Sequence, residues 1–262
     1  MDTLIITLSI LFYAASLFLL LNKMLSSYKA AKAFNITSVI ALLLHSAAVY
    51  QITLDNGQFS LGLTSALVVT SCTVSILSFF IHLKDRFKAL VAIAWAWSIV
   101  TLGLYFVLPP LHAAGHTNYL LATHIILSIG AYTVIAVATL EALFTLILDQ
   151  MLKRRKGIVF FSHFPPLQSL ESHFFLMLYF GQFLLTISLI SGFVAVEDFF
   201  AQHLVHKSVL SLVSWGIFSV LILGRTFAKW RGPVVLKWSL VAFTLTFIGY
   251  FGSKFVLQIV LG

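Results

Sequence analysis

The chain has 262 residues, of which 60% are hydrophobic and only 9% are charged, and its mean hydropathy is +1.04. A composition this apolar excludes a soluble globular domain and is typical of an integral membrane protein. The apolar stretches are continuous, whereas the strands of a membrane β-barrel alternate in polarity, so we expect helices. The sequence therefore predicts an all-α integral membrane protein with a single polytopic membrane domain over residues 1–262.

The net charge of +8 does not indicate nucleic-acid binding, because the basic residues gather in alternate loops, as they do in membrane proteins. The single cysteine, Cys72, lies in an apolar stretch, and the chain contains neither a CxxC nor a CxxCH motif. These observations exclude an internal disulfide, a thiol-exchange site and a covalently attached haem.

Eight apolar segments are long enough to cross a membrane as helices. Their expected bounds are Leu4–Leu21, Ile36–Leu54, a third segment ending at His82, Leu90–Leu108, Leu120–Leu148, Phe174–Val196, Ser208–Leu223 and Trp238–Leu261. Only Met1, Asp2 and Thr3 precede the first segment, so it lacks the positive leading region of a signal peptide, and we expect a retained helix.

Lysine and arginine residues predict the orientation of these helices. With both termini placed outside, fourteen basic residues fall in or beside inner loops and two at outer helix ends. The inner residues are Lys23, Lys29, Lys32, Lys84, Arg86, Lys88, Lys153, Arg154, Arg155, Lys156, Arg225, Lys229, Arg231 and Lys237, and the outer ones are Lys207 and Lys254. Because cytoplasmic loops are enriched in Lys and Arg, the N-terminus and the C-terminus are both predicted to be periplasmic.

Histidines are the residues most suited to carry chemistry. On this topology five of them lie in outer loops or just below the outer surface: His112, His116, His124, His203 and His206. Imidazole is a common metal ligand and an axial ligand of haem iron. The outer carboxylates are scattered, which disfavours a magnesium or calcium site, whereas opposing histidines above an aromatic-rich cleft suit a porphyrin. The alternative for the loop histidines is that they are solvated polar residues.

Two histidines lie within predicted helices, where ionisable groups are costly and usually functional. His124 is near the outer end of the fifth segment and His45 is near the middle of the second. For His45 the alternative is a neutral hydrogen bond between helices. Glu141 is too far along the fifth helix to share a site with His124, about 25 Å at 1.5 Å per residue. We interpret it as a snorkelling or inner-cavity carboxylate.

Four stretches resemble one family when they are taken together and in order. They are SVIALLLHSAAVYQ with GQFSL, ATHIILSIGAYTVIAVATLEALF, PPLQSLES with LLTISLISGF, and the C-terminal HKSVLSLVSWGIF with GRTFAKWRGPVVLKWSLVAFTLTFIGYFGSKFV. They resemble the cytochrome c assembly proteins of the CcsA/CcmC haem-handling superfamily, in particular its short eight-span branch of the YpjD (HemX-like) type. The resemblance covers most of the chain and implies a location in the bacterial inner membrane.

The resemblance implies roles for particular residues. His124 is similar to the family's outer histidine, an axial ligand or gatekeeper for haem, and His45 is similar to its buried histidine, which is linked to haem within the membrane. Lys207 is similar to the lysine that closes the family's Trp-rich loop. That loop is absent here, because AQHLVH precedes Lys207, and the second outer histidine is missing after the seventh segment. These departures indicate an accessory role rather than ligation of haem to an apocytochrome.

His206 is a candidate for the opposing axial ligand, because it precedes the seventh segment on the predicted outer side. The alternative is that water or a partner occupies that side of the iron. Together these features predict a protein that binds haem b through His124, His45 and His206 and catalyses no covalent reaction. Its expected partners are the lipid bilayer and other membrane proteins of cytochrome assembly. The alternative function is a non-haem small-molecule permease or a structural partner in a membrane complex.

The topology makes a first testable prediction. Alkaline phosphatase fused after Lys156 is expected to be inactive, because that basic loop is predicted to be cytoplasmic, and the same enzyme fused after Gly262 is expected to be active. The measurement is phosphatase activity in whole cells, with a green fluorescent protein fusion at each point as the reciprocal control. An active phosphatase after Lys156 would refute the orientation.

Overall fold

The computed structural model describes residues 2–21, 28–55, 58–59, 62–85, 88–108, 119–154, 166–195, 205–252 and 255. Within these residues, eight helices are long and apolar enough to cross a membrane, which confirms the predicted all-α membrane fold. A two-residue antiparallel ladder that the sequence did not predict, β1 (Leu54–Asp55) with β2 (Gln58–Phe59), lies in a loop. The side of the membrane that each helix end faces stays a prediction.

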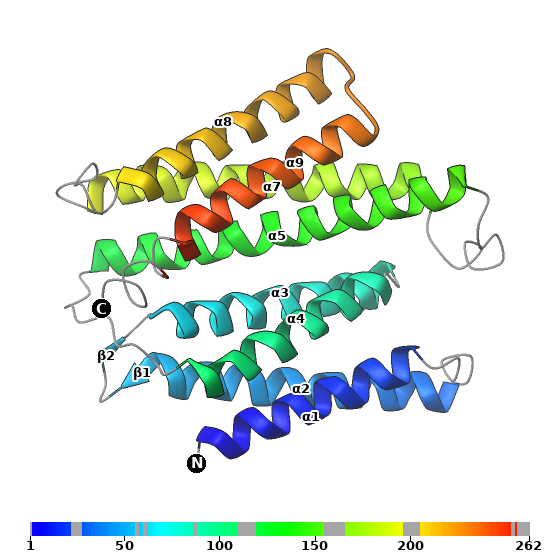
Figure 1. Ribbon diagram of the computed structural model, residues 1–262, viewed down its shortest axis with the longest axis vertical. Helices are drawn as coiled ribbons and strands as arrows, with labels where there is room; N and C mark the ends of the chain where they lie inside the picture. The colour runs from blue at the N-terminus through cyan, green and yellow to red at the C-terminus, as the bar shows by residue number, and fades with distance from the viewer. Residues whose placement is uncertain are drawn as a thin grey trace. The chain divides into compact units, whose positions relative to one another are not determined.

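The chain forms two compact units, Met1–Thr117 and Asn118–Gly262. The single domain over residues 1–262 stays a prediction. The first unit contains α1 (Asp2–Leu21), α2 (Tyr28–Thr53), α3 (Leu63–Asp85) and α4 (Lys88–Val107). The second contains α5 (Tyr119–Lys153), α7 (Leu167–Ala195), α8 (Val205–Phe227), α9 (Pro233–Phe247) and a π-helix, η2 (Ile248–Gly252). Within each unit, successive helices run in opposite directions (Figure 1).

Several helices begin earlier than the apolar segments predicted. Helix α2 begins at Tyr28 rather than Ile36, α7 at Leu167 rather than Phe174, and α9 at Pro233 rather than Trp238. Helix α5 also extends beyond its predicted end at Leu148, to Lys153. Hydropathy detects only the part of a helix that is apolar, whereas the helix itself continues until a breaking residue. Gly232, with a φ of 81°, and Pro233 in the first turn supply that break before α9.

The core of the first unit is centred on Trp95 of α4, which is fully buried. Its ring lies 5.1 Å from that of Phe34 on α2 and 6.0 Å from that of Tyr13 on α1. Between α3 and α4 the hydroxyl groups of Ser75 and Ser98 are 2.8 Å apart. Aromatic packing and serine pairs of this kind are typical of helix contacts in membranes, where a hydrophobic driving force between helices is missing.

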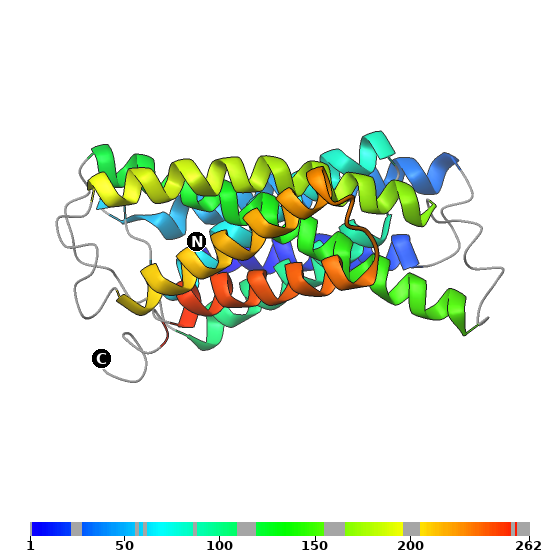
Figure 2. The same cartoon turned by 90° about the horizontal axis from the view of Figure 1, so that it is seen from above.

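The second unit is built on α5 and α7, which lie side by side along most of their length (Figures 1 and 2). A Cβ atom added to Gly181 of α7 would lie 2.6 Å from Cγ1 of Ile135 on α5, so this close approach requires glycine. Helices α8 and α9 form an antiparallel hairpin, with their connection at residues 228–232 (Figure 2). These contacts position the N-terminal part of α5 against the C-terminal part of α7.

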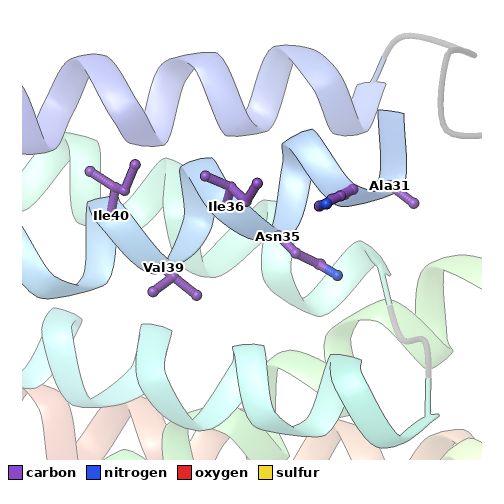
Figure 3. A pocket seen from close by; sticks show the side chains of 6 residues that line it. Ala31, Asn35, Ile36, Val39 and Ile40 are labelled. Atoms are coloured by element: carbon purple, nitrogen blue, oxygen red, sulfur yellow. The ribbon is translucent and has the colours of Figure 1, made fainter. Parts of the chain in front are cut away.

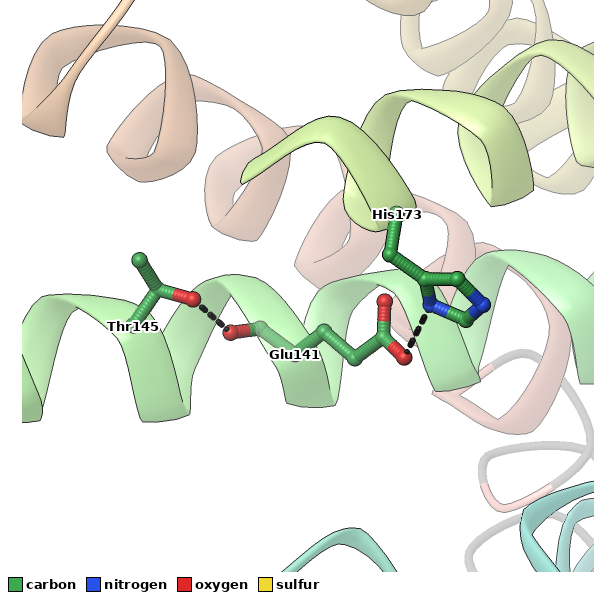
Figure 4. Close-up of polar contacts among 3 residues, drawn as sticks. All are labelled: Glu141, Thr145 and His173. Atoms are coloured by element: carbon green, nitrogen blue, oxygen red, sulfur yellow. Dashed lines mark hydrogen bonds and ion pairs between the residues drawn. The ribbon is translucent and has the colours of Figure 1, made fainter. Parts of the chain in front are cut away.

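A buried polar pair joins the other ends of α5 and α7. His173 Nδ1 lies 2.7 Å from Oε1 of Glu141, which has no exposed surface (Figure 4). The Thr145 hydroxyl donates to the Glu141 backbone carbonyl at 2.7 Å. The interpretation of Glu141 as a snorkelling carboxylate is therefore wrong, because its side chain has no exposed surface, and the inner-cavity alternative stays a prediction. Its carboxylate is enclosed between two helices, because a charged group in a membrane helix is stabilised by a hydrogen-bonding partner in the bundle.

This pair makes a second prediction. His173→Leu is expected to lower the free energy of unfolding by about 1–3 kcal/mol, because the buried Glu141 carboxylate loses a hydrogen bond. Removing both polar groups in Glu141→Leu/His173→Leu is expected to destabilise less than the sum of the two single changes. The measurement is unfolding in detergent micelles, analysed as a double-mutant cycle.

The control is Asp149→Asn, which breaks the exposed pair of Lys153 Nζ and Asp149 Oδ2 on the same helix. An exposed i,i+4 pair contributes about 0.3–0.5 kcal/mol, so this variant is expected to unfold almost as wild type does. Strictly additive effects of the Glu141 and His173 changes would show that the two side chains are not coupled.

Candidate functional site

His124 lies in the second turn of α5 and is partly buried against α7. Its Nδ1 atom is 2.9 Å from the backbone carbonyl oxygen of Ser188 and 3.3 Å from the hydroxyl oxygen of Ser191. A carbonyl oxygen only accepts hydrogen bonds, so the 2.9 Å contact assigns a proton to Nδ1. The ring is thereby held in one orientation by a backbone group of the facing helix.

The remaining ring nitrogen, Nε2, is left with its lone pair. Within the described part of the chain its hydrogen-bonding neighbour is Ser128 Oγ, at 3.5 Å. The Ser128 hydroxyl donates to the backbone carbonyl of His124 at 2.7 Å, so its one proton is already used. The hydroxyl oxygens of Ser188 and Ser128 are 2.7 Å apart, so the Ser188 hydroxyl is the donor and the Ser128 oxygen is the acceptor. A neutral imidazole with Nδ1 protonated and Nε2 unprotonated is the form that ligates a metal through Nε2.

Gly192 of α7 makes room for the imidazole ring. A Cβ atom at this position would lie 2.7 Å from Cε1 and 3.0 Å from Nδ1 of His124. Any larger residue would therefore displace the ring from the Ser188 carbonyl. The sequence pattern SLISG at 188–192 thus supplies a carbonyl acceptor, a hydroxyl group and a space within one turn of α7.

Lys207 is the second ionisable group of this region. It lies in the first turn of α8 and is close enough to His124 for the two side chains to interact electrostatically. Its Nζ atom is 5.0 Å from the centroid of the Tyr250 ring on η2. The structure therefore places the lysine that the sequence singled out near His124, on a different helix.

His45 belongs to the first unit and has no exposed surface. Its Nδ1 atom is 3.0 Å from the Tyr13 hydroxyl of α1, and the two rings meet edge to face with 5.6 Å between their centroids. Nε2 is buried without a hydrogen bond to any described residue, although the backbone of Val68 on α3 lies near the ring. The side chain of His45 is therefore fully enclosed by helices, whereas that of His124 is only partly buried.

The other predicted histidines lie outside what the structure describes. His206 is in the first turn of α8, but its side chain is not among the described ones, and His112, His116 and His203 fall in the undescribed segments. Among the described residues, no three His, Cys, Asp or Glu side chains are grouped as a metal site would require.

A surface pocket of about 460 Å³ lies along one face of α2 (Figure 3). Its lining residues are Ala31, Lys32, Asn35, Ile36, Val39 and Ile40. Neither His45 nor any other histidine lines it. The pocket is therefore separate from both intramembrane histidines.

Sequence reasoning missed the residues that position the two histidines. Tyr13, Ser188 and Gly192 were not singled out, because a tyrosine, a serine and a glycine within apolar helices are common packing residues. The available signal was the small-residue pattern SLISG, which marks a place where two helices approach closely. It did not identify the partner helix.

Comparison with known proteins gives a consistent result. The family model described as "Cytochrome C assembly protein" matches residues 33–261. The inner membrane protein YpjD of Escherichia coli (strain K12) is 30% identical over 233 residues, covering 86% of each chain. The protein HemX of Brevibacillus brevis is 26% identical over 253 residues, covering 94% of this chain and 93% of its own.

An uncharacterized 28.8 kDa protein in the nifR3-like 5'region of Azospirillum brasilense is 24% identical over 228 residues, with 82% of each chain covered. No solved structure matches the chain. The family match spans most of the sequence. Of the eight apolar helices that the structure describes, it includes part or all of every one except α1. The chain belongs to the cytochrome c assembly protein family and is a multi-pass protein of the bacterial inner membrane.

Proposed function

We propose that this protein binds haem b at His124 and handles it during cytochrome c assembly, in an accessory role and without catalysing a covalent reaction. The observation that carries the proposal is the hydrogen bond from His124 Nδ1 to the Ser188 carbonyl oxygen. It orients the ring and leaves Nε2 as a ligand atom, as in many histidine-ligated metal sites. Family membership supports the proposal independently.

The residues around His124 fit the iron of a haem group. One neutral imidazole is the donor that haem iron takes as an axial ligand, and the described residues offer no carboxylate cage for a hard cation. Haem in this role is cargo, and its iron supplies the Lewis acid that an imidazole recognises. The protein supplies the oriented nitrogen, the serine pair behind it and the space at Gly192.

The third prediction concerns His124. His124→Ala is expected to lose most of the haem that co-purifies with the protein, because the ligand atom is removed. Gly192→Ala is expected to weaken haem binding by roughly tenfold or more, because the added Cβ displaces the ring and its hydrogen bond. The measurement is the Soret absorbance and the pyridine haemochrome of detergent-purified protein, followed by haem titration.

Gly216→Ala is the matched control, because a Cβ atom at Gly216 meets nothing within 4 Å. His112→Ala and His203→Ala are expected to retain more haem than His124→Ala, since loop residues lose about 1–2 kcal/mol each of backbone entropy when they become ordered. Equal haem content in all these variants would exclude His124, and His45 would be tested next. A wild-type protein that takes up no haem after supplementation would favour a permease or a structural partner.

The fourth prediction concerns the opposite side of the iron. If His206 is the second axial ligand, wild-type protein is expected to contain low-spin iron and His206→Ala high-spin or mixed-spin iron. The ferric and ferrous absorption spectra of the two proteins measure this, with His203→Ala as the control. An unchanged spin state and haem content in His206→Ala would show that water or a partner occupies this position.

A further inference from the structure

The amino group of Lys207 has no carboxylate partner among the described residues. Its Nζ atom lies over the Tyr250 ring. Other partly or fully buried acidic and basic side chains of this unit are paired. His173 is paired with Glu141, and Arg225 is paired with Glu171 at 3.1 Å. Lys207 therefore differs from these partly buried charged residues, which lie towards the other end of the unit.

The position of Lys207 in α8 makes an anion beside it favourable. The residue lies in the first turn of the helix, where the partial positive charge of the helix dipole repels a cation and attracts an anion. His124 is a neighbour in electrostatic terms and contributes no negative charge. A cation–π contact with Tyr250 compensates only in part, because an aromatic ring carries no net charge.

The surroundings of Lys207 are aromatic and closely packed. The ring of Tyr250 lies 5.5 Å from that of Tyr132, which is on α5 with His124. A Cβ atom added to Gly249 would lie 3.0 Å from Cβ of Leu210 and 3.6 Å from the backbone oxygen of Lys207, so η2 is held against α8. The lysine thus lies beside the Tyr250–Tyr132 pair, at the end of the unit that contains His124.

This combination points to the chemistry of the ligand. A single cation beside aromatic rings, with an oriented imidazole nearby, matches an amphipathic molecule that carries a carboxylate on an aromatic, metal-containing body. We propose that Lys207 binds a carboxylate side chain of the porphyrin whose iron faces His124. The inference rests on the proposed haem function, and it adds a specificity-determining residue for the acid form of the porphyrin.

The test uses two iron-free porphyrins and the full-length protein in a neutral detergent. Protoporphyrin has two free carboxylates, and its dimethyl ester has none. Wild-type protein is expected to bind the acid roughly tenfold more tightly than the ester or better, the difference that one charge-assisted hydrogen bond supports. Quenching of intrinsic tryptophan fluorescence gives both dissociation constants.

Lys207→Gln is expected to abolish this preference by weakening binding of the acid and not of the ester. Lys207→Arg retains the charge and is expected to keep the preference, which separates the charge from the shape of the side chain. Lys229→Gln is the control, because Lys229 is an exposed lysine whose Nζ donates to the Thr226 carbonyl. An unfolding experiment in detergent checks that each variant is folded. If Lys207→Gln does not fold, the test is the preference of Lys207→Arg for the acid over the ester, and a loss of that preference would overturn the inference.

An equal affinity of wild type for acid and ester, or a preference that persists in Lys207→Gln, would overturn the inference. The same holds if neither porphyrin binds. Because neither ligand contains iron, the outcome does not depend on the axial role of His124. Haem binding that is insensitive to His124→Ala would instead refute the proposed function while leaving a Lys207-dependent preference intact.

Discussion

Polar groups within a bilayer must find their partners inside the protein, and the rest of this structure depends on that constraint. Within each helix the backbone N–H and C=O groups are hydrogen-bonded to one another. Many serine and threonine hydroxyl groups donate to the backbone carbonyl one turn earlier, as Ser128 does to that of His124. Stronger polar groups need a partner on another helix. Tyr13 with His45, His124 with the Ser188 carbonyl, and Glu141 with His173 are the three main cases. Each therefore joins two helices as well as placing a titratable group.

The α5–α7 pair shows how packing and chemistry use the same residues. Glycines on α7 allow the helices to approach, Gly181 against Ile135 and Gly192 against the His124 ring. At the second contact the space is filled by an imidazole rather than an aliphatic chain. The same approach that stabilises the helix pair in lipid thus brings the Ser188 carbonyl within hydrogen-bonding distance of Nδ1. The orientation of the His124 ring and the stability of the helix pair are consequently linked.

The fold could be predicted from the sequence because a membrane limits the choices. Continuous apolar runs predicted the eight long helices that the structure describes, and what was missed lies at their ends, such as Tyr28 to Asn35 of α2. His124 could be selected because an ionisable residue stands out within an apolar run. Its partners could not, because a helix that is hydrophobic on every side gives little indication of which face packs inward. For the same reason the enclosure of Glu141 by His173 had no signal in the spacing of residues.

The π-helix at Ile248–Gly252 has a consequence for how related chains are compared. A π turn contains about one residue more than an α-helical turn, so it is equivalent to a single-residue insertion accommodated without breaking the helix. Without that extra residue, everything beyond it would rotate by about 100° around the axis. The direction in which Tyr250 faces Tyr132 therefore depends on the number of residues in this turn as well as on their types. Two proteins with the same tyrosine but one residue more or fewer before it would present that ring to different neighbours.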